Sequence, residues 1–206
     1  MSALVGNKAI WYLMRGSGAV SLLLLTAVLV LGIVTAARVR SPRVSRVFTM
    51  GMHRSVSLLA LAFLAIHIAT AVLDRYASVR LVDVIVPFTA AKRPLFLGLG
   101  ALSLDLLLAV AITSALRYRL GLRAWRAIHW LGYATWPFAL THALGIGSDA
   151  GTSWMLVIAA GSITAVALAL VVRLRSAPGG DRQPASGPSR MPARIATARP
   201  SREAGR

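Results

Sequence analysis

Five runs of mostly apolar residues, each about 20 residues long, constrain the fold of this chain more than any other feature. An α-helix of about 20 apolar residues is long enough to span the hydrocarbon core of a bilayer. We therefore predict an all-α integral membrane bundle of five transmembrane helices. The five runs are 18–37, 52–73, 94–116, 125–146 and 152–172.

Composition agrees with a membrane protein and limits its redox chemistry. Of the 206 residues, 57% are hydrophobic and only 14% are charged, which is outside the range of soluble globular domains. We predict one membrane domain over residues 1–175 and a disordered, basic cytoplasmic tail over 176–206, where Pro, Gly, Ser, Ala and Arg dominate. Because the chain has no cysteine, any redox cofactor would be held by imidazole or would be a bound flavin.

Basic residues at the ends of the runs predict the orientation. Of the 23 lysines and arginines, 17 lie after the first run, between the third and fourth runs or after the fifth, and six lie on the other side. The more positive side of a membrane protein faces the cytoplasm, so we expect the N-terminus outside and the C-terminus inside the plasma membrane. Because the arginines cluster at run ends and in the tail, the net charge of +17 indicates membrane topology and not nucleic-acid binding.

The four histidines of the chain form two matched pairs. His53 and His67 lie 14 positions apart in the second run, and His129 and His142 lie 13 apart in the fourth. At about 1.5 Å per residue, the members of each pair are roughly 20 Å apart along a helix. Two such helices side by side would present facing imidazoles near each membrane face. This spacing suits two stacked metal centres, and we interpret them as two b-type haems, each held by two histidines.

Interhelical hydrogen bonding and zinc binding are the alternatives for these histidines. We favour haem ligation because an imidazole in hydrocarbon is costly without a partner, and because four histidines occur in two such pairs. Iron would take one ring nitrogen, and the other could donate to a nearby carbonyl or hydroxyl group.

Helical phase fits the first pair better than the second. At about 100° per residue, His53 and His67 are about 40° apart and share a face, whereas His129 and His142 are about 140° apart. We therefore expect a distortion between the second two. Pro137 lies in that interval, with Gly132 nearby, and a proline can kink or rephase a helix, although an ordinary membrane-helix kink explains Pro137 equally well.

Other residues near the pairs are candidates with alternative explanations. Arg54 follows His53 and Arg126 precedes His129 by one turn, so either guanidinium could bind a haem propionate, but positive-inside charge explains both equally well. Asp105 is the one acid inside a run; it could hydrogen-bond near a haem, handle protons or pack against a serine or threonine. Three tryptophans are more typical of interfacial anchors than of electron relays: Trp125, Trp130 and Trp154.

Residues 81–91 form an apolar segment too short to cross a bilayer, and Pro87 interrupts it. We expect this segment to be interfacial or re-entrant and to cover the outer site.

The paired spacing, 13 intervening residues and then 12 on two helices that run the same way, resembles the ferric reductase-like transmembrane domain of ferric reductases and NADPH oxidases. The stretches GMHRSVSLLA (51–60) and RAWRAIHWLGY (123–133) resemble those of bacterial members, and the resemblance covers roughly residues 10–175. It implies haems that bridge corresponding helices. His53 would then pair with His129 at the inner haem, and His67 with His142 at the outer haem.

The chain differs from long members of that family, which have six spans and a cytosolic flavin and nicotinamide domain. We therefore expect a separate cytoplasmic flavoprotein, or quinol from the bilayer, to be the electron donor. The related haem subunit of the periplasmic methionine sulfoxide reductase system is similar in this respect.

Two axial imidazoles leave haem iron no open position, which favours electron exchange without substrate ligation or a catalytic side chain. We expect an oxidoreductase, or its haem subunit, that transfers electrons from a cytoplasmic donor to an acceptor at the outer face, such as a ferric chelate, oxygen, a quinone or a partner flavoprotein. A quinol-oxidising cytochrome b membrane anchor is the alternative. A transition-metal transporter is less favoured, because a transport route usually offers several acidic or thiol ligands.

Overall fold

The computed structural model describes residues 2–37, 45–146 and 149–176, and every regular element in these ranges is a helix. The predicted all-α fold is confirmed for this part of the chain. The predicted tail, 176–206, lies outside the described residues except for Ser176. The helices are α1 (Ser2–Ala36), α2 (Arg46–Leu73), α3 (Leu81–Ile85), α4 (Pro94–Ala115), α5 (Arg117–Leu120), α6 (Leu122–His129), α7 (Gly132–Ile146) and α8 (Ser153–Arg175).

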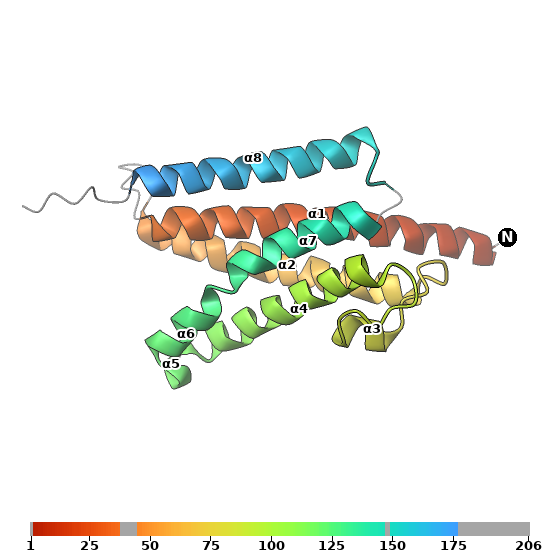
Figure 1. Cartoon of the computed structure of the whole chain (residues 1–206), viewed down its shortest axis with the longest axis horizontal. Coiled ribbons are helices and arrows are strands. Elements are labelled where there is room, and N and C mark those ends of the chain that lie inside the picture. The colour runs from red at the N-terminus through yellow and green to blue at the C-terminus, as the bar shows by residue number, and fades with distance from the viewer. Residues whose placement is uncertain (1, 38–44, 147–148, 177–206) are drawn as a thin grey trace, which may run out of the picture.

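Four of these helices are long and apolar enough to cross a membrane: α1, α2, α4 and α8. They correspond to the first, second, third and fifth predicted runs. The prediction of a single helix over the fourth run, 125–146, is wrong, because α6 ends at His129 and α7, only 15 residues long, begins at Gly132. Figure 1 shows the turn that joins them.

The break between α6 and α7 is made by short-range backbone bonds. Leu131 N donates to Ile128 O (2.9 Å), and Tyr133 N donates to Trp130 O (3.1 Å), so the chain tightens into i to i−3 turns. Pro137, the expected site of distortion, lies inside α7 and does not end it. The distortion therefore comes six residues before the proline, directly after His129.

α1 is the central helix of the bundle. It packs against α2, α7 and α8, while α4 packs against α7. Figure 1 shows α8 on one side of α1 and α4 on the other, with the N-terminus and the end of α8 at opposite ends of the bundle. Each of the two histidine-bearing segments therefore lies against α1 or α4.

The faces of α8 show how the bundle is arranged for a bilayer. Its buried residues recur every three or four positions and form one stripe: Met155, Ala159, Ser162, Val166 and Ala169. Apolar side chains on its other faces are exposed, as for Val157 (69%) and Leu168 (61%). A helix that exposes so much apolar surface suits a lipid environment, and the chain is a multi-pass membrane protein.

Local signals fix several helix ends. The Ser45 hydroxyl accepts a hydrogen bond from Phe48 N (3.2 Å) and caps α2, and Pro94 begins α4 at a position where its missing N–H costs nothing. Gly121 separates α5 from α6 with φ of 78°, a conformation that glycine adopts without strain. These ends set where each histidine segment starts.

Candidate functional site

The structure brings the four histidines together as two facing pairs. His53 and His67 lie on α2, His129 ends α6, and His142 lies on α7. The ring centroids of His53 and His129 are 6.4 Å apart with an interplanar angle of 67°. Those of His67 and His142 are also 6.4 Å apart, at 80°. The partners are therefore the ones that the sequence resemblance implies.

Three of the four imidazoles bond to a backbone carbonyl of a neighbouring helix through Nδ1. A carbonyl oxygen can only accept a hydrogen bond, so Nδ1 carries the proton and donates it, and Nε2 keeps the lone pair that a metal needs. The contacts are His53 Nδ1 to Val28 O (3.1 Å), His67 Nδ1 to Met14 O (2.9 Å) and His142 Nδ1 to Phe96 O (2.8 Å).

Each of these carbonyls lies four residues before a glycine that faces the same ring. A Cβ added at Gly100 would lie 2.5 Å from His142 Nδ1, and one at Gly18 would lie 2.9 Å from His67 Cε1. At Gly32 it would lie 3.5 Å from His53 Cε1, which is ordinary contact. The missing side chains at Gly18 and Gly100 thus let the rings reach the helix backbone.

This arrangement was missed in the sequence analysis, although the sequence carries a signal of it. Gly18 and Gly32 are 14 positions apart on α1, the same separation as His53 and His67 on the adjacent α2. Two helices packed along their length would place these residues at matching levels.

His129 is held differently. Its Nδ1 atom is buried and has no hydrogen-bond partner among the described residues. The indole of Trp125 stacks on the imidazole, with ring centroids 4.9 Å apart and an interplanar angle of 28°. Trp125 Nε1 donates to the Ser114 hydroxyl of α4 at 3.3 Å. Trp125, expected to be a membrane anchor, therefore contacts a member of the inner pair.

A cavity of about 530 Å³ surrounds the His67 and His142 pair. Its walls come from α1, α2, α3, α4, α7 and α8 and are mostly apolar, with Trp154 among the lining residues. This volume is in the range of cofactor-binding pockets. Charged residues also line it: Arg15, Asp74, Asp83, Lys92, Arg93 and Asp149.

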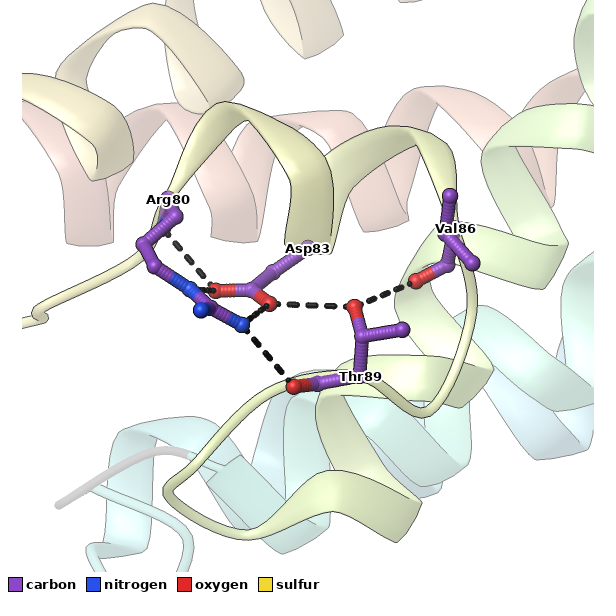
Figure 2. A network of polar contacts seen from close by, with 4 residues as sticks. All are labelled: Arg80, Asp83, Val86 and Thr89. Atoms are coloured by element: carbon purple, nitrogen blue, oxygen red, sulfur yellow. Dashed lines mark hydrogen bonds and ion pairs between the residues drawn. The ribbon is translucent and has the colours of Figure 1, made fainter.

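A polar network fixes the segment that follows α2 (Figure 2). The Arg80 guanidinium donates to both carboxylate oxygens of Asp83, at 2.7 and 3.0 Å, and Thr89 Oγ1 donates to the same carboxylate at 3.0 Å. Asp83 is only 2% exposed, and the hydrogen bond from Arg80 holds the pKa of its carboxyl well below the usual range. Because Asp83 and Val84 line the cavity, this network positions α3 beside the pair of His67 and His142.

Further contacts tie the connecting segments to the bundle near this cavity. Arg15 forms an ion pair with Asp149, and its guanidinium lies 3.9 Å from the ring centroid of Trp11. Arg93 donates to the carbonyl oxygen of Gly145.

The remaining predicted site residues lie on the helices of the bundle. Arg54 and Arg126 have exposed side chains on the helices of the inner pair, and Asp105 is half-buried within α4. Their proposed roles toward a cofactor stay predictions.

Each pair has room for one metal ion between its rings. A metal–imidazole bond of about 2.0 Å on each side, plus about 1 Å from each nitrogen to its ring centre, gives about 6 Å. The observed 6.4 Å in both pairs agrees with this sum. Each pair would supply two nitrogen ligands, and zinc usually takes four protein ligands in a structural site, so an ion with its other positions already filled fits better.

Residues 17–146 match the family model described as ferric reductase like transmembrane component. The matched segment contains the four histidines and the three glycines that face them, and it ends before α8. No curated protein and no solved structure matches the chain.

Proposed function

Because the chain belongs to the ferric reductase-like transmembrane component family, we propose that it transfers electrons across the membrane by means of two b-type haems, each held by one of the histidine pairs. The observation that carries this proposal is the equal 6.4 Å separation of the two pairs, each between α2 and the α6–α7 segment.

His53 and His129 would hold the inner haem, and His67 and His142 the outer haem. A bound haem would supply an iron that accepts and releases one electron, and the two imidazoles of each pair would be its protein ligands. The chain contributes the orientation of its ligands, since the carbonyls of Val28, Met14 and Phe96 accept hydrogen bonds from Nδ1–H and fix three of the rings.

The direction of transfer follows from the predicted orientation, with the inner pair near the cytoplasm. Arginines flank the inner pair on α5 and α6, and Arg54 and Arg126 would bind haem propionates. The donor would be a separate cytoplasmic flavoprotein, which would carry any flavin or nicotinamide cofactor. The acceptor would bind at the outer face, next to the cavity around His67 and His142.

The test is an oxidised-minus-reduced optical spectrum of the purified protein with haem quantified per chain. We expect two b-type haems in the wild type and one in His67→Ala. The neighbouring variant Ile66→Ala, whose parent side chain is 41% exposed, is the matched control and should keep both. A wild-type protein without haem, after expression with adequate haem supply, would contradict the proposal.

The donor is tested with the same preparation. Reduction by NADPH that requires an added flavoprotein would support the proposed donor. Reduction of the protein by a quinol alone would favour the alternative, a quinol-oxidising cytochrome b membrane anchor.

A further inference from the structure

The inner pair contains the one imidazole that is not oriented by a backbone carbonyl. His53, its partner, bonds to the Val28 carbonyl at 3.1 Å. The Nδ1 atom of His129 is buried without a hydrogen-bond partner among the described residues. A metal ligand normally has its second ring nitrogen fixed by such a partner, so another contact has to set the orientation of this ring.

The sequence of α4 explains why a carbonyl is not offered to His129. On α4 the ring of His142 lies at Gly100. His129 and His142 are 13 residues apart. The position 13 residues after Gly100 on α4 is Thr113, so α4 has no glycine there. The Thr113 hydroxyl donates to the carbonyl of Ala109 at 2.7 Å, four residues earlier. His142 bonds to the carbonyl of Phe96, four residues before Gly100. The equivalent carbonyl, four residues before Thr113, is that of Ala109, and it already accepts a hydrogen bond from the Thr113 hydroxyl.

Trp125 supplies the contact that remains. It precedes His129 by four residues on α6, so the two side chains lie on the same helix face. Its indole lies nearly parallel to the imidazole, 28° between planes and 4.9 Å between centroids. A stack of this kind hinders rotation of the smaller ring.

The indole is itself fixed from a second helix. Trp125 Nε1 donates to the Ser114 hydroxyl of α4 at 3.3 Å. This matters because α6 ends at His129 and the chain turns at Trp130 and Leu131, so the backbone at His129 has a helix on one side only.

We propose that Trp125, fixed by Ser114, is the positioning residue for His129 and takes the role that backbone carbonyls have for the other three histidines. This inference rests on the proposed function, because it concerns the orientation of a haem ligand. It makes the inner site dependent on one side chain that the outer site does not use.

The variants that test it are Trp125→Leu, Trp125→Phe and Ser114→Ala. Tyr118→Leu is the matched control for a general anchoring role, because Tyr118 is an aromatic residue on the adjacent α5 and is 85% exposed. The readouts are haem per chain and the electron paramagnetic resonance g-values of each oxidised centre, which depend on the orientation of the two axial rings. His129→Ala and His67→Ala assign the signals to the inner and outer centres.

We expect Trp125→Leu to lower the haem affinity of the inner site by tenfold or more and to shift the g-values of any inner haem that remains. Trp125→Phe keeps a stacking ring but loses the bond to Ser114, so Trp125→Phe and Ser114→Ala should both keep most of the affinity and give a smaller shift of the same sign. The outer signal should not change. Tyr118→Leu should resemble the wild type.

An inner signal in Trp125→Leu identical to that of the wild type would overturn the inference. Equal loss at both centres, or an equal effect of Tyr118→Leu, would also overturn it, because either result indicates general packing or anchoring. Wild-type protein that binds no haem would overturn the proposed function, and this inference with it.

Discussion

At the scale of single residues, the site depends on glycines as much as on histidines. Each of three imidazoles lies against a glycine and bonds to the carbonyl one helical turn before it. The ring thereby gains a hydrogen-bond acceptor inside an apolar bundle, where an unpaired polar group would be costly. At Gly18 and Gly100 the absence of a Cβ makes this contact possible.

The tolerance of these glycines to alanine should follow the distances of the added Cβ. Gly100→Ala and Gly18→Ala would place Cβ at 2.5 and 2.9 Å from ring atoms of the outer pair, so His142 or His67 must move. We expect a tenfold or greater loss of haem affinity at the outer site in both variants, measured by haem titration of each site.

Two other glycines of α1 are controls for this series. Gly32→Ala makes only ordinary contact at 3.5 Å, and Gly16→Ala meets nothing within 4 Å. Both should keep two haems, and Gly16→Ala should raise stability by up to about 1 kcal/mol, since alanine is the better helix former. Equal haem loss in Gly16→Ala and Gly18→Ala would show that close approach to the ring is not the cause.

At the scale of elements, the short helix α3 is stabilised mainly by a network of charged and polar side chains. It has only five residues, too few for a stable isolated helix, and the buried Asp83 carboxylate joins its first turn to Arg80 and to Thr89 beyond its end. The predicted outer segment, 81–91, is thus a short helix with an ionic network at its base, and it lines the outer cavity.

Acid should loosen this segment. The Arg80 hydrogen bond lowers the pKa of Asp83 in the folded protein below its ordinary value of 3.8, so the unfolded chain binds more protons as the pH falls. The stabilisation is complete above the ordinary value and is lost as the pH falls below it and through the folded pKa. Amide hydrogen exchange should therefore show residues 80–89 losing protection below about pH 4, in contrast to α8.

Asp83→Asn should remove both the protection of residues 80–89 at neutral pH and its dependence on acid. Unchanged exchange in this variant would mean that packing of α3 against α4 alone holds the segment.

The elements also show what could be predicted from the sequence and what could not. Apolar run length identified α1, α2, α4 and α8, because lipid imposes one requirement on every spanning helix. A distortion between His129 and His142 was expected, with Pro137 in the interval and Gly132 nearby. The break lies directly before Gly132, and Pro137 continues α7.

Tertiary contacts surround the break instead. The Arg173 side chain of α8 donates to the Tyr133 hydroxyl, and its guanidinium lies 5.3 Å from the ring centroid of Trp130. Such contacts join residues about 40 positions apart in the chain, so a pattern of neighbouring residues cannot predict them. A backbone carbonyl looks alike at every position of a sequence, so the carbonyls that bond to Nδ1 are indicated only indirectly, on α1 by the matching 14-residue spacing of Gly18 and Gly32.

At the scale of the whole molecule, the α2 segment and the α6–α7 segment run alongside α1 and α4 and carry one histidine pair toward each end of the bundle. α8 lies outside the matched family segment, yet it packs on α1 and reaches the α6–α7 break through Arg173. The pairs share helices but use separate carbonyls and separate glycines, so each site should form independently of the other.

If the two sites form independently, a variant that loses one haem should keep the other haem but lose electron transfer across the membrane. We expect His53→Ala and His67→Ala each to keep one haem per chain, because the other pair retains its contacts. Each should reduce transfer from a reductant trapped inside proteoliposomes to an impermeant ferric chelate outside by at least a hundredfold, because about 20 Å of the path then has no redox centre. Ile66→Ala should transfer at the wild-type rate. Loss of both haems in either histidine variant would contradict separate sites, and wild-type transfer in His53→Ala would show that the inner pair is not on the path.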